Sequence, residues 1–197
     1  MASYLVSLGR LQFTINLLNL PGKVPPEQET KVGQGVFGKV MVKTVAGGRF
    51  VAKVMTQSWD IQSEYKNLVE DAVLEIAISK LCAMFQIGPD IETRIPFDLI
   101  LYEDGVQFHM EKCVTIQQLI KDQQMNYLRV QEDIRYCLQV LHSLHIVHKD
   151  IKPDNVLYCE RLKRFVLCDF GCSDYVKEEI GEVSVTNCAG SPEFMGP

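Results

Sequence analysis

One stretch of eight residues concentrates side chains that together could handle phosphate, a metal ion and a proton. His148 to Asn155 reads H-K-D-I-K-P-D-N. Asp150 could accept the proton of an attacking hydroxyl group, and Lys152 could stabilise a transferred phosphoryl group. Asn155 could offer an amide oxygen to a divalent cation, because hard cations prefer oxygen ligands. The competing interpretation is a solvated charged turn, and His148 is expected to pack beneath the loop.

A further acidic group follows a short apolar strand. Asp169-Phe170-Gly171 comes directly after the short apolar segment 165–168, which includes the expected strand 166–168. An Asp at the end of a buried strand could reach a metal ion, and Gly171 would let the chain turn away. The tripeptide alone has little specificity, so its meaning depends on the rest of the chain.

A lysine lies inside an apolar strand nearer the N-terminus. Lys53 is the lysine of the run V-A-K-V, and an unpaired charge is costly to bury there. It therefore needs an anion, either a phosphate, a carboxylate from the following helix, or both. Glu75 is the preferred carboxylate because it lies on the apolar side of that helix, and Glu70 is the alternative. A lysine that extends to solvent at a strand edge is the competing interpretation.

Three glycines precede this lysine with a spacing that suits a phosphate chain. Gly33, Gly35 and Gly38 belong to the run G-Q-G-V-F-G-K-V. In a strand–turn–strand unit, such glycines let backbone N–H groups point at phosphate oxygens. A dinucleotide fold would need a helix after the glycines, whereas a strand is expected here. A glycine hairpin without a ligand is the alternative.

Hydrophobic periodicity and turn signals predict the elements that position these residues. The expected strands are 31–35, 39–45, 50–55, 99–102, 106–110, 156–157 and 166–168, and the expected helices are 61–85, 115–121 and 130–145. The fold class is therefore α+β. A small five-stranded antiparallel sheet with one long helix is followed by a mainly helical region.

The first residues show an apolar stripe at steps of four and three, which predicts a helix over residues 2–20. The stripe consists of Tyr4, Leu8, Leu11, Ile15 and Leu18. This helix would pack on the following domain, and a partner-binding or membrane-surface helix is the alternative. Pro21-Gly22 would end it, and Pro25-Pro26 would form a stiff linker.

Composition narrows the class of protein. The 197-residue chain has a net charge of -5, which argues against nonspecific nucleic-acid binding. Its seven cysteines are scattered, so reduced thiols in a cytoplasmic or nuclear protein fit better than a disulfide framework or a zinc cluster. No run of about 18 apolar residues occurs, so no membrane-spanning helix is expected.

The order and spacing of these motifs resemble the eukaryotic protein-kinase family, in its serine/threonine branch. The resemblance covers residues 29–197, and the branch is indicated by Lys152 and by the run G-S-P-E-F at residues 190–194. It implies a bilobal fold. Residues 1–28 would be an N-terminal helical extension and linker, 29–113 the N-lobe and hinge, and 114–197 a partial C-lobe.

The resemblance implies ATP and Mg²⁺ as cofactors and a role for each matching residue. Asp150 would be the catalytic base, with Lys152 beside it. Asn155 and Asp169 would bind Mg²⁺. The residues implied to contact or cover ATP are Val32, Gly33, Gln34, Gly35, Val36, Phe37, Gly38, Lys39, Val40, Ala52, Lys53, Glu75, Met110, Glu111, Cys113 and Leu157.

Within that set, Lys53 would hold the α- and β-phosphates and pair with Glu75. Met110 resembles the gatekeeper, residues 111–113 resemble the hinge, and Leu157 resembles the floor of the adenine pocket. The implied activity is transfer of the γ-phosphoryl group of ATP to serine or threonine hydroxyls of a protein substrate.

Several positions depart from the family pattern. Lys149 stands where arginine is usual, and Ser79 stands where a bulky apolar residue is usual if Glu75 is the ion-pair partner. Asn187 occupies the usual phosphorylation position of the activation segment, so regulation by phosphorylation there is not expected. The last residues read M-G-P where the family has A-P-E, and the helices that normally follow are absent.

That last departure leaves three expectations open: a fragment, a natural truncation, or a partner that covers the incomplete C-lobe. It also motivates a second hypothesis. The chain would be a truncated, non-catalytic kinase mimic that binds nucleotide or a full kinase and acts as an inhibitor or decoy.

Overall fold

The computed structural model describes residues 2–24, 31–35, 38–44, 50–56, 62–91 and 96–176, with backbone alone for residues 31–35, 38–44 and 62–65. The chain divides into two compact units. The first is drawn from residues 1–80 and 90–112, and the second from residues 81–89 and 113–197. Val36, Phe37, residues 45–49 between two of the predicted strands, and the activation segment beyond residue 176 lie outside the described residues.

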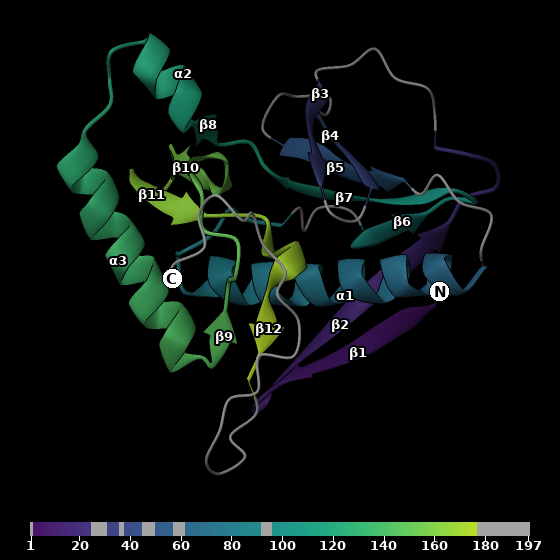
Figure 1. The fold of residues 1–197 in the computed structure, drawn as a ribbon. Helices are drawn as coiled ribbons and strands as arrows, with labels where there is room; N and C mark the ends of the chain where they lie inside the picture. Colours follow the sequence, from purple (N-terminus) through teal and green to yellow (C-terminus); the bar gives the residue numbers. More distant parts are fainter. Residues whose placement is uncertain are drawn as a thin grey trace. The chain divides into compact units, whose positions relative to one another are not determined.

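The first unit contains a seven-stranded mixed sheet in the order β1-β2-β6-β7-β5-β4-β3 (Figure 1). Its strands are β1 (Ser3–Leu8), β2 (Leu11–Asn19), β3 (Lys31–Gly35), β4 (Gly38–Thr44), β5 (Phe50–Thr56), β6 (Leu99–Leu101) and β7 (Gly105–Glu111). Neighbours are antiparallel except for β2 and β6, which are parallel. The predicted five antiparallel strands are β3 to β7, and the prediction is wrong in omitting two strands and the parallel pair.

The omitted strands are the N-terminal residues, so the helix predicted over residues 2–20 is wrong. β1 and β2 form a hairpin around Gly9, whose φ of 62° suits glycine. In β2, the side chains of Phe13, Ile15 and Leu17 are buried and alternate with more exposed neighbours. Because alternate residues of a strand share one face, this period of two places all three side chains in the core. The pairing of β2 with β6 favours the strand period of two over the helical period on which the helix prediction rested.

The residues after β2 also contact the sheet. The backbone N–H of Gly22 donates to Glu103, and that of Val24 donates to the Asp104 carboxylate at 2.7 Å. The Val24 side chain packs against the buried pair Ala52 and Val54. This segment is therefore held against the β6–β7 hairpin as far as Val24, and Pro25-Pro26 lies outside the described residues.

The long helix α1 (Gln62–Met84) matches the prediction for residues 61–85. Between Leu68 and Cys82 its side chains are buried around most of the circumference, and these include the polar residues Glu75 and Ser79. A helix buried on so many sides cannot leave a carboxylate there without a partner.

From residue 113 to residue 176, the described part of the second unit consists of two helices and several short strands. They are β8 (Val114–Thr115), α2 (Ile116–Lys121), α3 (Tyr127–Ser143), β9 (Ile146–Val147), β10 (Val156–Cys159), β11 (Arg164–Leu167) and β12 (Asp174–Tyr175), with 3-10 turns η1 (Pro153–Asn155) and η2 (Phe170–Cys172). Its sheets have the orders β11-β10-β8 and β12-β9. The helix α3 begins three residues before the prediction because the Asn126 side chain caps it, accepting from the N–H of Arg129.

None of the described helices combines the length and the apolar character needed to cross a membrane.

Candidate active site

In the first unit, Lys53 and Glu75 form a buried ion pair. Lys53 lies on β5 and Glu75 on α1, with 2.5 Å between Nζ and Oε1 and side chains only 6% and 1% exposed. The ammonium group also lies 5.7 Å from the centre of the Phe108 ring. The alternative partner, Glu70, instead pairs with Lys66 at 3.6 Å on the exposed helix surface. The predicted pairing with Glu75 is therefore confirmed, and the pairing with Glu70 is excluded.

The described glycines lie on two paired strands, and the two residues between these strands lie outside the described residues. β3 and β4 pair antiparallel, with Gly33 opposite Val40 and Gly35 opposite Gly38. A strand rather than a helix follows the glycines, which disfavours a dinucleotide fold. The side chains of Val32, Gln34, Lys39 and Val40 lie outside the described residues.

The other predicted adenine-pocket residues of this unit lie on neighbouring strands. Ala52 and Met110 are buried, on β5 and β7, and the two strands pair antiparallel. Glu111, at the end of β7, accepts from the N–H of Asp90 at 3.2 Å and donates its own N–H to the Asp90 carbonyl at 2.7 Å. This reciprocal pair fixes the first residue of the predicted hinge.

In the second unit, Asp150 is buried and held by two donors from its own loop. Its Oδ2 accepts from Lys152 Nζ at 2.7 Å and from Asn155 Nδ2 at 3.0 Å. The same Asn155 nitrogen donates to the Asp150 carbonyl at 2.8 Å. Because that nitrogen faces Asp150, the amide oxygen of Asn155 points away from it. The predicted loop residues therefore lie together, in a cluster with a fixed carboxylate at its centre.

His148 supports this cluster from below. Its Nδ1 accepts from the N–H of Asp150 at 3.3 Å, so the proton of the neutral ring is on Nε2, which donates to the Cys168 carbonyl at 3.0 Å. The ring lies 5.1 Å from that of Phe170, and Ser173 Oγ donates to the His148 carbonyl. Burial lowers the pKa of His148, against the opposing effects of the Cys168 carbonyl, Asp169 and Asp150. This placement agrees with the structural role predicted for His148.

Asp169 belongs to the same cluster. It follows β11 with φ of 64° and ψ of 70°, a left-handed conformation at the start of η2. The hydrogen bond from the Cys168 N–H to the Asn155 carbonyl, at 3.0 Å, ties this turn to η1. Partial burial acts to lower the pKa of Lys152, but the hydrogen bond that Lys152 donates to Asp150 and the charges of Asp150, Asp169 and Asp154 raise it above its usual value. Lys152 is therefore a cation at neutral pH.

Sequence reasoning missed two residues that hold this cluster in place. Ser173 anchors the backbone of His148, and Asp174 pairs with Lys149, with 2.6 Å between Oδ2 and Nζ. Both lie on or beside β12, which pairs with β9. A strand of two residues leaves no periodic pattern, so the only available signal was the short distance in sequence from Asp169.

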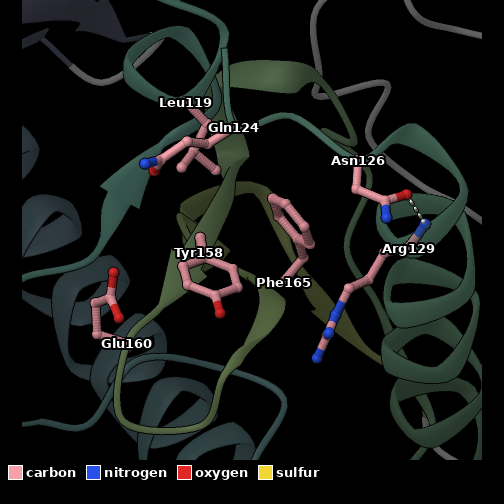
Figure 2. A pocket seen from close by; sticks show the side chains of 7 residues that line it. All are labelled: Leu119, Gln124, Asn126, Arg129, Tyr158, Glu160 and Phe165. Carbon is pink, nitrogen blue, oxygen red and sulfur yellow. Dashed lines mark hydrogen bonds between the residues drawn. The ribbon is translucent and has the colours of Figure 1, made fainter. Parts of the chain in front are cut away.

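An open hollow of about 330 Å³ lies elsewhere in the second unit, between α2, α3, β10 and β11 (Figure 2). It is lined by Leu119, Gln124, Asn126, Arg129, Tyr158, Glu160 and Phe165. The Arg129 guanidinium donates to the Lys163 carbonyl, and Glu160 pairs with Lys163. The lining includes none of the predicted site residues, so this hollow is not part of the predicted active site.

Comparison with known proteins agrees with this geometry. Residues 27–197 match the family model described as protein kinase domain, so the chain belongs to the protein kinase family. Its similarity extends to the serine/threonine branch.

Three relatives in that branch illustrate the similarity. A "non-specific serine/threonine protein kinase" of Drosophila melanogaster is 26% identical over 83% of this chain and 24% of its own length. Serine/threonine-protein kinase Sgk2 of Mus musculus is 27% identical, over 84% of this chain and 44% of its own length. Serine/threonine-protein kinase pakC of Dictyostelium discoideum is 28% identical, over 85% and 34%. The chain thus spans less than half the length of each relative.

Proposed function

We propose that this chain transfers the γ-phosphoryl group of ATP to serine or threonine hydroxyls of protein substrates. The observation that carries the proposal is the Asp150 carboxylate, which Lys152 and Asn155 hold by the same oxygen. A carboxylate fixed in this way is ready to orient a hydroxyl group and to accept its proton. A solvated charged turn would not bury Asp150 and Asn155 together.

Lys152 would supply positive charge next to the transferred group. Its raised pKa keeps the ammonium group protonated, and its hydrogen bond to Asp150 limits its position. Fixed charges of this kind stabilise developing negative charge without reorganisation of solvent. Lys152 would therefore act together with Asp150 rather than as a second base.

The residues proposed to hold Mg²⁺ fit a hard cation. Asn155 turns its amide nitrogen towards Asp150 and its oxygen away, and Asp169 adds a carboxylate from the end of β11. Both are oxygen ligands, which suit Mg²⁺ rather than a soft metal. When bound, Mg²⁺ would neutralise charge on the phosphate oxygens. Asn155 and Asp169 would place it, and the loop hydrogen bonds would keep Asn155 in one orientation.

The residues proposed to hold ATP fit a phosphate chain. Glu75 fixes the Lys53 ammonium group in the first unit, so this cation does not need to be ordered when the phosphates bind. The glycine hairpin formed by β3 and β4 would cover the phosphates, and buried Ala52 and Met110 would contact the adenine. Glu111, Cys113 and Leu157 complete the proposed adenine contacts.

The described cysteines are thiols, which supports a cytoplasmic or nuclear location.

The test is transfer of labelled phosphate from ATP, in the presence of Mg²⁺, to a generic basic protein rich in serine. We expect the purified chain to label this substrate and Asp150→Asn to lower the rate by about 10²–10⁴-fold, the usual contribution of a positioned base. Asp122→Asn, at the exposed C-cap of α2, is the matched control and should retain full activity. If the chain binds ATP without any transfer, the proposal is wrong and the non-catalytic mimic replaces it.

A further inference from the structure

Two cysteines of the second unit lie opposite one another at the end of a strand pair. β8 and β10 are antiparallel, with Leu157 opposite Thr115 and Tyr158 opposite Val114. One further step in this register places Cys159 opposite Cys113. The two Sγ atoms lie within 4.8 Å of one another. Two thiols that are 46 positions apart in sequence are thus brought together by sheet register.

This geometry suits a disulfide bond. Residues directly opposite in an antiparallel pair have Cα atoms about 4.5–5.5 Å apart, and a disulfide needs Cα atoms about 4.4–6.8 Å apart. The sulfurs therefore need only a rotation of the side chains to come within bonding distance, and the strands can keep their register. The structure holds both residues as thiols.

The two cysteines differ in access to solvent, which sets the order of reaction. Cys113 is partly exposed, whereas Cys159 is fully buried. An oxidant would therefore react with Cys113 first. The buried Cys159 thiol would then react with the oxidised Cys113. The buried cysteines Cys82 and Cys137 are poor competitors, because burial raises the pKa of both, that of Cys137 to about 11.

We propose that Cys113 and Cys159 form a site of oxidative modification, at which hydrogen peroxide converts the thiol pair into a cross-strand disulfide. The Cys113 sulfur, after loss of its proton, attacks one oxygen of the peroxide. The O–O bond breaks, and Cys113 becomes a sulfenic acid while the departing hydroxide takes up the thiol proton and forms water. The Cys159 sulfur then attacks the Cys113 sulfur, the S–O bond breaks, and the leaving hydroxide takes the Cys159 proton. The balance is two thiols and one peroxide to one disulfide and two waters.

The bond would join the two ends of the segment 113–159, which includes α2, α3 and the Asp150 loop. Closing a segment of this length restricts the unfolded chain, so the oxidised protein should melt roughly 4–12 °C higher than the reduced protein. This inference does not depend on kinase activity, because the register of β8 and β10 alone brings the two thiols close together.

The test uses the full chain, reduced and then exposed to a small excess of hydrogen peroxide. Remaining thiols are blocked with N-ethylmaleimide, and peptides are mapped by mass spectrometry without reductant. We expect a peptide pair linked through Cys113 and Cys159 that disappears after dithiothreitol. In Cys159→Ala the link should be lost, and a dimedone adduct on Cys113 should increase because the sulfenic acid persists. Cys172→Ser, which removes another partly exposed thiol of this unit, should keep the link.

The result that overturns the proposal is oxidation of Cys113 to sulfinic acid, or its linkage to a different cysteine, while Cys159 in the wild-type chain remains blocked by N-ethylmaleimide. This outcome is read from the wild-type chain itself. A variant that fails to fold therefore does not prevent a decision.

Discussion

The buried ion pair of the first unit and the Asp150 loop of the second are assembled in different ways. Lys53 and Glu75 are 22 positions apart, and they meet only because strand β5 packs against helix α1. Asp150, Lys152 and Asn155 are at most five positions apart, and they bond to one another within one loop. The ion pair therefore depends on tertiary packing, whereas the loop depends on local backbone geometry.

The two regions are therefore sensitive to different kinds of substitution. A buried charge whose partner is removed has no solvent to replace it, so the whole desolvation cost appears. In the Asp150 loop, a single substitution removes only some of the hydrogen bonds, and the Asp150 carboxylate keeps its other donors.

Glu75→Leu should give the largest loss of stability. It removes the partner of Lys53 and leaves a charge in a site that is 6% exposed, at an expected cost of about 3–5 kcal/mol in the free energy of unfolding. Urea denaturation followed by circular dichroism would measure this change. Glu70→Leu, whose ion pair with Lys66 is exposed, should change the stability by less than about 0.5 kcal/mol.

The double variant Lys53→Met with Glu75→Leu sharpens this result. With both charges gone, most of the lost stability should return, because an apolar pair of similar volume carries no desolvation cost. If the double variant is as unstable as Glu75→Leu, the loss comes from poor packing in α1 rather than from the unpaired charge.

Asn155→Ala should have an intermediate effect on stability. It removes the donor to both the carbonyl and the carboxylate of Asp150, at an expected cost of about 1–3 kcal/mol, less than the loss in Glu75→Leu. The same urea titration applies. Asp154→Ala, one position earlier and exposed, is the control for changes to η1 itself and should cost less. Equal losses in the two variants would mean that the hydrogen bonds to Asp150 add little.

The contrast also explains which parts of the structure the sequence could predict. The loop was predictable because its residue types and short spacing already specify their mutual contacts. The pairing of Lys53 with Glu75 was predictable with one alternative, because a lysine in an apolar strand needs an anion and helical periodicity puts Glu75 on the apolar side.

The N-terminal strands were not predictable in the same way. The residues of β2 satisfy a helical stripe and also an alternating strand pattern. The deciding interaction is the parallel pairing of Leu17 with Leu99, far along the chain. Local propensity cannot report such a contact. The two-residue strands β8, β9 and β12 were not predicted for a related reason. They are too short to show a pattern of their own, and they form only by pairing with other strands.

Acidification should lower stability through His148. Burial holds the pKa of His148 below its usual value in the folded protein, so the unfolded chain binds more protons at pH values between the folded and the unfolded pKa. Stability is then complete above the unfolded pKa of about 6.5 and falls as the pH drops, by at most about 1.4 kcal/mol per pH unit for one proton.

Urea titrations at about pH 7.5 and pH 5.5 would measure this effect in the wild type and in His148→Gln. The glutamine variant should be less stable at both pH values but should show a smaller difference between them. His142→Gln, on the exposed part of α3, is the control and should keep the wild-type difference. An unchanged difference in His148→Gln would assign the pH dependence to other groups.

The ion pair between Lys149 and Asp174 gives the smallest expected effect and the closest comparison with Lys53 and Glu75. Its 2.6 Å between nitrogen and oxygen is nearly the same as the 2.5 Å of the buried pair, but the Asp174 side chain is 50% exposed where that of Glu75 is 1% exposed. Asp174→Asn should therefore cost only about 0.2–1 kcal/mol, and the cost should shrink as salt rises from about 0.05 M to about 1 M. Urea titrations at both salt concentrations would show this. The two ion pairs have nearly the same nitrogen–oxygen distance but differ in burial. A loss of stability in Asp174→Asn as large as that in Glu75→Leu would therefore mean that burial does not set the strength of these ion pairs.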